Sequence, residues 1–364
     1  MKVIRVNLDK KVCASHQIHV GEGILGRMGL ILAKNNWASR YLVVTDSNVS
    51  SIYGEKVLAI MREASLPADI VVVPAGETSK AMPTCLHLVD TMTRLGADRG
   101  SALIALGGGV VGDMTGFVAS VYMRGIPYVQ VPTTFLAQVD SAIGGKTGID
   151  LPQGKNLLGT FLQPKGVFID LGFLRTLSYR EFANGLAEVI KYGLIDDPAL
   201  LDLLESKAEA IMSYELGVLE EVVWKSCTIK KAVVEVDETE KGLRRILNFG
   251  HTVGHAIEAE SGYTISHGEA VSMGMVAEAF ISEKLRHLST EERRRIEALL
   301  RSFGLPQRIP GSLETDGIVS RIWVDKKKTG RTVPFVLLKK IGFPFVNGDV
   351  PERLLRETIE ELKE

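Results

Sequence analysis

The sequence predicts an α/β domain with a parallel sheet over residues 1–172, followed by a mainly α-helical domain over residues 173–364. In the first part, short apolar runs alternate with helical periodicities, a pattern typical of a parallel sheet flanked by helices. After residue 172, long helical periodicities replace the strand-like runs. The length of 364 residues supports the division, because single hydrophobic cores stop growing at roughly 250–300 residues.

The apolar runs of the first part end at residues that form turns. Residues 1–20 alternate apolar and polar side chains, which predicts a strand or a hairpin ending at Gly21-Glu22-Gly23. Further buried strands are expected at 41–45, 70–73, 101–106, 128–131 and 166–170, with helices at 53–65 and 79–96.

The second part is expected to be mostly helical. Helical periodicities run near 180–196, 198–211, 215–236 and 268–287. A further helix over 290–303 has Thr290 as its predicted N-cap and Gly304 as its stop. A strand at 333–338 and an amphipathic helix close the chain.

Charge and composition exclude several classes of protein. The 43 Lys and Arg side chains balance 44 Asp and Glu, so no overall field favours nucleic acid or an anionic membrane. No apolar run approaches the roughly 18 residues of a membrane span. The three cysteines, Cys13, Cys85 and Cys227, form no Cys-x-x-Cys pair, which suits a reducing compartment. We therefore expect a cytoplasmic protein whose ligands are small molecules.

A glycine-rich turn follows the expected strand at 101–106. Gly107, Gly109 and Gly112 have the spacing Gly-x-Gly-x-x-Gly, which lets backbone N–H groups approach a pyrophosphate at a helix N-terminus. A tight strand-to-helix turn without a ligand remains the alternative. A Rossmann fingerprint is followed about 20 residues later by an acid at a strand end, whereas here that strand ends in Pro132-Thr133-Thr134. The pattern favours a nucleotide-binding domain with a non-classical, Rossmann-like parallel sheet.

Acidic residues at earlier strand ends could serve the same nucleotide. Asp46 follows the strand at 41–45 and could accept hydrogen bonds from a ribose. Glu77 and Lys80 follow the strand at 70–73 and could reach the same ligand, although taken alone these two residues favour a surface ion pair.

Polar residues, most of them basic or hydroxyl-bearing, crowd the 33 residues from Arg124 to Asn156. They are Arg124, Thr133, Thr134, Gln138, Asp140, Lys146, Lys155 and Asn156. Lysines beside glycines suit a small anion, because the backbone can fold close and ammonium groups can converge. The segment is not a P-loop, since Ser141 stands where the motif requires glycine. Exposed loop lysines without a ligand are the alternative.

A group of histidines and a carboxylate predicts a metal site in the second part. His251 and His255 lie one helical turn apart, but Thr252 occupies the position of the metallopeptidase glutamate. His267 and Glu188 could complete a ligand set, since a lone charge at Glu188 among apolar neighbours would be costly. A capping His267 and a salt-bridged Glu188 are the alternatives. Two histidines and one carboxylate would leave positions open on Zn²⁺ for a substrate hydroxyl, as alcohol oxidation beside a nicotinamide requires.

Ordered motifs through residues 15–345 resemble the 3-dehydroquinate synthase family, the shikimate-pathway branch of the sugar phosphate cyclases. The motifs are Gly76-Glu77-x-x-Lys80, Gly107-Gly108-Gly109-x-x-Gly112-Asp113, Tyr122-Met123-Arg124-Gly125, Pro132-Thr133-Thr134, Gln138-Val139-Asp140-Ser141, Gly144-Gly145-Lys146-Thr147, Gly154-Lys155-Asn156, Arg180-Glu181, Ala187-Glu188-Val189-Ile190-Lys191, Asn248-Phe249-Gly250-His251-Thr252-x-Gly254-His255, His267-Gly268-Glu269 and Asp325-Lys326-Lys327.

The resemblance implies a role for each group of residues. It implies that Glu188, His251 and His267 bind the metal, usually Zn²⁺ with Co²⁺ as an alternative, and that His255 faces the substrate. It implies NAD contacts by Asp46, Glu77, Lys80, Gly108, Gly109, Asp113, Thr133, Thr134, Asp140, Lys146, Lys155, Thr176 and Glu181. It implies substrate contacts by Arg124, Lys146, Asn156, Lys191, Lys230, Arg244, Asn248 and one or both of Lys326 and Lys327.

The implied activity converts 3-deoxy-D-arabino-heptulosonate 7-phosphate into 3-dehydroquinate and phosphate. The implied route is transient NAD-dependent oxidation, phosphate elimination, re-reduction and intramolecular aldol closure, which is carbon–oxygen lyase chemistry. A homodimer is usual for the family. Another sugar phosphate cyclase, a metal-dependent polyol dehydrogenase and a non-catalytic ligand-binding protein on the same scaffold are the alternatives.

Overall fold

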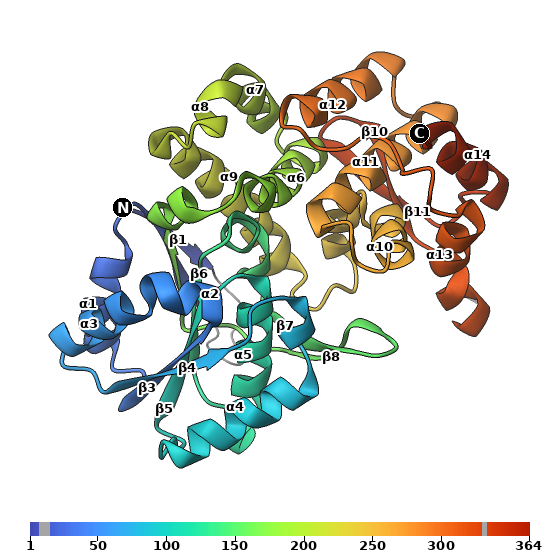
Figure 1. Ribbon diagram of the computed structural model, residues 1–364. Coiled ribbons are helices and arrows are strands. Elements are labelled where there is room, and N and C mark those ends of the chain that lie inside the picture. Colours follow the sequence, from blue (N-terminus) through green and yellow to red (C-terminus); the bar gives the residue numbers. More distant parts are fainter. Residues whose placement is uncertain (7–14, 330–332) are drawn as a thin grey trace. The chain divides into compact units, whose positions relative to one another are not determined.

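The computed structural model describes residues 1–6, 15–329 and 333–364, without the side chains of residues 324–329 (Figure 1). The described chain forms two compact units, Met1–Leu177 with Leu219–Thr239, and Ser178–Val218 with Glu240–Glu364. The first unit thus ends five residues beyond the predicted boundary at 172 and gains a later segment. The functional domains, 1–172 and 173–364, stay a prediction.

A seven-stranded sheet forms the centre of the first unit. Its strands are β1 (Lys2–Val6), β2 (His16–Gly21), β3 (Arg40–Asp46), β4 (Ala68–Val73), β5 (Ser101–Gly107), β6 (Tyr128–Pro132) and β9 (Gly166–Asp170). They lie in the order β1-β2-β9-β6-β5-β3-β4, and only β1 pairs antiparallel. All seven residues of β5 are buried, as expected for a parallel strand covered on both faces. The predicted α/β class and strand positions are confirmed.

Helices cover both faces of this sheet. Helices α1 (Leu25–Asn35) and α3 (Glu55–Glu63) pack with Val43 on one face, whereas α4 (Met82–Arg94) and α5 (Gly109–Val121) pack with Val44 on the other. The chain therefore changes direction between β3 and β5, and ligands of such sheets bind where the carboxyl ends of the strands flank this point. Short helical segments complete the connections: α2 (Ser47–Val49), η1 (Ser50–Gly54), η2 (Glu77–Ser79), η3 (Tyr122–Arg124), η4 (Ala137–Ser141) and η5 (Leu171–Thr176).

A hairpin of β7 (Lys146–Leu151) and β8 (Gly154–Phe161) stands apart from the main sheet. The sequence analysis named no strand between residues 132 and 166, where glycines interrupt the alternation of side chains. The glycines permit close contact instead: a Cβ at Gly159 would lie 2.3 Å from the carbonyl oxygen of Thr147 on the partner strand.

Helix α9 (Leu216–Val236) contributes residues to the first unit through polar contacts. Lys230 Nζ lies 2.7 Å from the backbone oxygen of Asp140 and 2.8 Å from its carboxylate. The Cys227 thiol donates to the carbonyl of Gln138 at 3.5 Å. These contacts attach a segment from the later half of the chain to the unit formed by residues 1–177.

The second unit is mainly helical, as predicted. Its other elements are α6 (Tyr179–Ile195), α7 (Pro198–Ser206), α8 (Ala208–Met212), η6 (Leu243–Asn248), α10 (His251–Glu260), α11 (His267–Lys284), α12 (Thr290–Ser302), α13 (Thr315–Thr329), β10 (Phe335–Lys340), β11 (Phe343–Asn347) and α14 (Glu352–Leu362). The helix expected at 198–211 is two helices, α7 and α8, separated at Lys207.

The predicted N-cap of α12 is wrong by one residue. Ser289 caps the helix and forms a reciprocal capping box with Glu292, and Thr290 is the first helical residue. The sequence Ser289-Thr290 offers two capping hydroxyls, and only the one followed three residues later by Glu forms the box. Among the described residues, no helix is both long and apolar enough to cross a membrane.

Candidate functional site

Three helices of the second unit bring the predicted metal ligands together. Glu188 lies on α6, and the histidines begin two helices: His251 is the first residue of α10, and His267 is the first residue of α11. Glu188 Oε1 lies 3.4 Å from Nε2 of His251 and 3.3 Å from Nε2 of His267. The candidate ligand atoms of all three side chains lie within 4.8 Å of one another.

The buried carboxylate carries the strongest indication of an ion. Glu188 has no exposed surface, and its Oε1 makes no hydrogen bond although it faces two ring nitrogens. Its other oxygen contacts the ammonium of buried Lys191. Burial opposes ionisation, but Lys191 and the two histidines hold the pKa of Glu188 well below its usual range. An ionised carboxylate with an unpaired inward oxygen fits a divalent cation such as Zn²⁺.

The two histidines differ in their proton chemistry. Burial and then the charge of Lys191 hold the pKa of His251 well below its usual value, so its imidazole is neutral, as a ligand must be. Burial also works against a charge on His267, but the carboxylates of Glu188 and Glu258 raise its pKa to about 9. Metal binding at this cluster would displace that proton.

Glycines let the three helices approach closely enough to form the cluster. A Cβ at Gly274 on α11 would lie 1.9 Å from the carbonyl oxygen of Gly250, and one at Gly254 would lie 2.9 Å from that of Ala270. A Cβ at Gly268 would lie 2.5 Å from the carbonyl oxygen of Asn184 on α6. Any larger side chain at these positions would separate the helices that carry the ligands.

Helix α10 also carries His255, one turn beyond His251. The ring centroids of these histidines lie 5.2 Å apart, and the ring of His255 lies 6.0 Å from that of His267. His255 is exposed and is absent from the Glu188 group, although it forms a second possible ligand group with Glu258 and His267.

The predicted substrate contacts of the second unit lie near the same helices in the chain. Lys191 is one turn beyond Glu188 on α6, and Arg244 and Asn248 lie on η6, which precedes α10. Arg244 is buried, whereas the amide of half-buried Asn248 donates to Glu240 at 2.8 Å. Lys326 and Lys327 belong to α13, and their side chains lie outside the described residues.

The glycine-rich turn of the first unit forms a cradle at the carboxyl edge of the sheet. Gly108 is the N-cap of α5, and a Cβ there would lie 2.9 Å from Cγ2 of Thr134. A Cβ at Gly109 would lie 3.1 Å from Oγ of Ser141. The Oγ atoms of Thr133 and Ser141 are buried and make no hydrogen bond, so hydroxyl groups surround the turn without partners. A pyrophosphate at the α5 N-terminus would fit this arrangement.

The other side of this edge is formed by the end of β3. Asp46 caps α2 by accepting hydrogen bonds from the backbone N–H groups of Asn48 and Val49, at 2.9 and 3.0 Å. Asp46 and the glycine turn therefore flank the point at which the strand order reverses.

A buried lysine links the helix after the glycine turn to the hairpin. Lys80 is 5% exposed, and its Nζ lies 2.7 Å from Oδ2 of Asp113 on α5 and 2.6 Å from Oδ1 of Asn156 on β8. Burial raises the pKa of Asp113, against the opposing effect of Lys80. Beside this group, Lys155 Nζ lies 3.2 Å from Glu77 Oε1. The structure thus brings five predicted cofactor or substrate residues into one polar group.

The remaining predicted site residues lie apart from these groups or pair locally. Arg124 is exposed beyond the C-terminus of α5, roughly 20 Å from the glycine turn at a rise of about 1.5 Å per residue. Lys146 is exposed at the start of β7, and the Thr176 hydroxyl lies 2.8 Å from that of Tyr53. Glu181, a predicted NAD contact, is exposed on α6 of the second unit.

Three residues near these groups were missed by the sequence analysis. Glu258 is buried, and its Oε2 lies 3.6 Å from Nδ1 of His267; its position seven residues after His251 on one helix could have indicated it. Ser141 was named in a family motif and for its failure to fit a P-loop, but it was not predicted as a site residue. Glu278, fully buried on α11, accepts from backbone N–H groups at the start of α10, and no sequence signal links the two helices.

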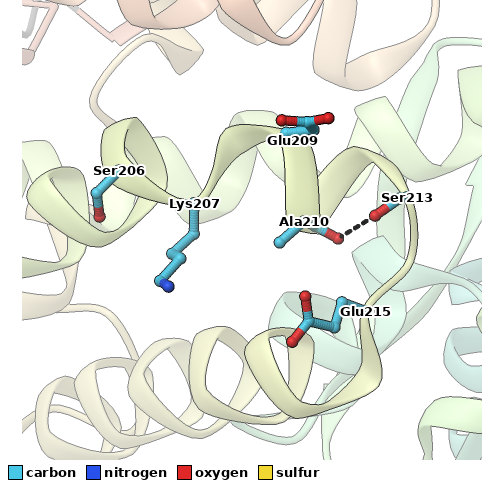
Figure 2. A pocket seen from close by; sticks show the side chains of 6 residues that line it. All are labelled: Ser206, Lys207, Glu209, Ala210, Ser213 and Glu215. Atoms are coloured by element: carbon cyan, nitrogen blue, oxygen red, sulfur yellow. Dashed lines mark hydrogen bonds between the residues drawn. The ribbon is translucent and has the colours of Figure 1, made fainter.

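One surface pocket is lined by no predicted site residue. Figure 2 shows its lining, which comes from the end of α7, from α8 and from the connection between α8 and α9: Ser206, Lys207, Glu209, Ala210, Ser213 and Glu215. The polar residues among them are all exposed at the surface. It contains no metal-ligand group and is not the candidate active site.

Comparisons with known proteins agree with the two groups of residues. The family models described as 3-dehydroquinate synthase N-terminal and 3-dehydroquinate synthase C-terminal match residues 70–184 and 185–328. The 3-dehydroquinate synthase of Thermodesulfovibrio yellowstonii is 41% identical over 362 residues, covering 99% of this chain and 100% of the relative. That of Symbiobacterium thermophilum is 44% identical over 353 residues, covering 96% and 98%.

Solved structures of other cyclases share the fold. ValA, a 2-epi-5-epi-valiolone synthase from Streptomyces hygroscopicus with NAD⁺ and Zn²⁺ bound, is 30% identical with a TM-score of 0.89, covering 99% of each chain. A 2-deoxy-scyllo-inosose synthase complexed with carbaglucose-6-phosphate, NAD⁺ and Co²⁺ is 26% identical with a TM-score of 0.85, covering 99% of this chain and 100% of the other. An iron-containing alcohol dehydrogenase, at 17% identity and a TM-score of 0.69 over 98% and 97%, shows likeness of fold alone.

Proposed function

The chain belongs to the 3-dehydroquinate synthase family. We propose how the residues around Glu188 and those around the glycine-rich turn serve the reaction of this family. The substrate is 3-deoxy-D-arabino-heptulosonate 7-phosphate, and the products are 3-dehydroquinate and phosphate. The reaction is a carbon–oxygen lyase reaction, because the C–O bond to phosphate breaks by elimination.

The reaction needs both a redox cofactor and a Lewis acid. When bound, NAD⁺ supplies reversible acceptance of the C5 hydride, and Zn²⁺ or Co²⁺ supplies polarisation of the C5 oxygen. Oxidation at C5 acidifies the neighbouring C–H, so the substrate can lose a proton and phosphate. Return of the hydride, ring opening and aldol closure complete the sequence with no net redox change.

The observation that carries this proposal is the buried Oε1 of Glu188, which makes no hydrogen bond and lies between two imidazole nitrogens. Glu188, His251 and His267 would hold the metal and leave positions open for the substrate. His255 lies one turn away on α10 and is exposed, so it would face the substrate and not join the ligand set.

Residues of the first unit would bind the cofactor. Backbone N–H groups at Gly108 and Gly109 would receive the pyrophosphate, and the free hydroxyl of Thr133 would donate to it. The other residues of the first unit proposed as NAD contacts are Asp46, Glu77, Lys80, Asp113, Thr134, Asp140, Lys146, Lys155 and Thr176, and Glu181 of the second unit is proposed as a further contact. Lys80 would also position the amide of Asn156, which it already contacts.

Basic side chains would hold the anionic groups of the substrate. The proposed set is Arg124, Lys146, Asn156, Lys191, Lys230, Arg244, Asn248 and one or both of Lys326 and Lys327. A metal-dependent polyol dehydrogenase needs no such set of basic residues. The iron-containing alcohol dehydrogenase resembles this chain in fold alone. Charge-assisted contacts to phosphate and carboxylate would also keep the opened intermediate in position for ring closure.

Two further properties belong to the same proposal. A homodimer is the usual assembly of this family. A cytoplasmic location would suit Cys85 and Cys227, both buried free thiols, because neither forms a disulfide.

The proposal is tested by following phosphate release from the heptulosonate substrate with NAD⁺ far below the substrate concentration and Zn²⁺ present. We expect stoichiometric phosphate and no accumulation of NADH, because the hydride returns to the product. Stoichiometric NADH without phosphate would instead identify a polyol dehydrogenase.

Replacing Thr133 by Val tests the cofactor assignment with a side chain of equal shape. We expect weaker NAD binding, by roughly tenfold for one lost hydrogen bond. The free energy of unfolding should stay equal or rise by up to about 1 kcal/mol, because the buried Oγ1 has no hydrogen bond to lose. Calorimetric titration with NAD and chemical denaturation measure the two effects. Unchanged NAD affinity would remove Thr133 from the cofactor site.

A further inference from the structure

Helix α11 carries a buried carboxylate that the proposed reaction leaves without a role. Glu278 lies three turns after His267 on α11 and has no exposed surface. Its Oε2 accepts a hydrogen bond from the backbone N–H of Gly250 at 2.6 Å, and its Oε1 accepts from that of Val253 at 3.4 Å. Gly250 directly precedes His251, the first residue of α10, and Val253 lies two residues after it.

The orientation of the His251 ring depends on the same peptide unit. Nδ1 of His251 lies 3.2 Å from the carbonyl oxygen of Phe249. A carbonyl oxygen only accepts, so Nδ1 must carry the proton, and Nε2 is left with a free lone pair facing Glu188 Oε1 at 3.4 Å. The Phe249 carbonyl therefore selects the tautomer that can bind a metal through Nε2.

The hydrogen bond to Glu278 and the hydrogen bond from His251 lie at opposite edges of one rigid peptide unit. The carbonyl of Phe249 and the N–H of Gly250 belong to a single peptide bond, which is planar, so fixing one group fixes the other. Glu278 holds the N–H side, and His251 donates to the C=O side. Because hydrogen bonds in series polarise one another, the hydrogen bond that Glu278 accepts from Gly250 also strengthens the Phe249 carbonyl as an acceptor.

The backbone at this point has little freedom to take another arrangement. Gly250 has a φ of +81°, which side chains disfavour, and a Cβ there would lie 2.5 Å from Cγ of Met275. Glu278 adds a directional contact to this packing. Packing alone would set where α10 begins, whereas the hydrogen bond sets the tilt of the peptide plane.

We propose that Glu278 is a positioning residue for the metal site, acting on His251 through the peptide unit between Phe249 and Gly250. The inference rests on the proposed metal site and adds to it a residue that contacts no metal but positions one of the ligands. It predicts that the acceptor at position 278, and not merely the volume there, sets the affinity for the metal.

The test compares two variants of the full-length protein that separate acceptor from volume. Glu278→Met keeps a similar volume but removes the acceptor, and we expect its Zn²⁺ dissociation constant to rise roughly 10- to 100-fold. Glu278→Gln keeps one oxygen acceptor for Gly250, and we expect its constant to stay within about threefold of the parent. Competition with a chromophoric chelator measures the Zn²⁺ dissociation constants of the parent and both variants. The absorption spectrum of bound Co²⁺ reports the ligand geometry.

A stability control lies one turn further along the same helix. Ser282 is fully buried, and its hydroxyl donates to the carbonyl of Glu278 and accepts from the N–H of Leu338. Ser282→Ala should therefore lower stability as Glu278→Met does, but leave the Zn²⁺ affinity and the Co²⁺ spectrum unchanged. Equal metal affinity in Glu278→Met and the parent, or an equal loss in Ser282→Ala, would overturn the proposal.

Two further variants separate this inference from the metal assignment itself. His251→Ala should abolish tight Zn²⁺ binding; if it binds as the parent does, the proposed metal site is wrong. If only Glu278→Met binds normally, the metal site stands and the role of Glu278 fails. Should Glu278→Met not fold, Glu278→Asp withdraws the carboxylate by one methylene, and an affinity equal to that of the parent would then count against the proposal.

Discussion

Replacing Glu188 by Gln is expected to abolish tight metal binding and to lower turnover on the order of 10³-fold. The carboxylate supplies the anionic ligand of the cluster, and its Oε1 faces both histidine nitrogens. A neutral amide is a weak ligand, and loss of the Lewis acid removes several kcal/mol of transition-state stabilisation. Zn²⁺ content after dialysis and the rate of phosphate release measure the two losses. Retention of both would remove Glu188 from the metal site.

A second variant separates the lost ligand from the lost ion pair. Glu188 contacts the buried Lys191 ammonium, so Glu188→Gln leaves an uncompensated charge, which typically costs about 3–5 kcal/mol. Adding Lys191→Met removes that charge, and we expect the double variant to recover part of the stability while metal binding stays lost. Recovery of metal binding in the double variant would show that the charge at Lys191, and not the missing ligand, caused the defect.

Replacing Gly274 by Ala is expected to destabilise the second unit by about 3 kcal/mol and to weaken metal binding with it. The new Cβ would lie 1.9 Å from the carbonyl oxygen of Gly250 and 2.8 Å from the backbone nitrogen of Gly254. Both atoms belong to the backbone at the start of α10, so the helix itself must move. His251 would move with it, away from Glu188 and His267. Chemical denaturation and chelator competition measure the two effects.

Gly217 provides the matched control for this substitution. It also lies in a helix, α9, but a Cβ there would meet no atom within 4 Å. Gly217→Ala should leave metal binding unchanged and raise stability by up to about 1 kcal/mol, because alanine favours the helix. If Gly274→Ala behaved like Gly217→Ala, close packing of α10 on α11 would not be what assembles the ligands.

Much of the first unit follows from local sequence. The five apolar runs predicted as parallel strands are strands. A strand buried on both faces requires continuous apolar side chains, and runs of four to six residues are too short for a typical buried helix. The glycine-rich turn is equally local, since Gly108 and Gly109 meet neighbouring hydroxyl-bearing side chains directly. The hairpin of β7 and β8 was missed because glycines such as Gly148 and Gly159 hide its alternation.

Contacts between distant segments could not be read in the same way. Helix α9 follows the boundary at residue 172, yet Lys230 reaches Asp140, 90 residues earlier, and its segment joins the first unit. Hydrogen bonds over such separations leave no periodic trace in the chain. Arg124, predicted as a substrate contact, follows the C-terminus of α5, and its role stays a prediction.

The sequence by itself determined the candidate ligand types and their order: Glu188 among apolar neighbours, His251 and His255 one turn apart, and His267 before a helix. Spacing left open which histidine joins the metal, because both could point into one cavity. The tertiary structure favours His251 and His267, since both ring nitrogens converge on one buried carboxylate oxygen while His255 remains exposed. Only the tertiary structure also revealed Glu278, because its hydrogen bond to Gly250 arises when two helices pack at backbone distance.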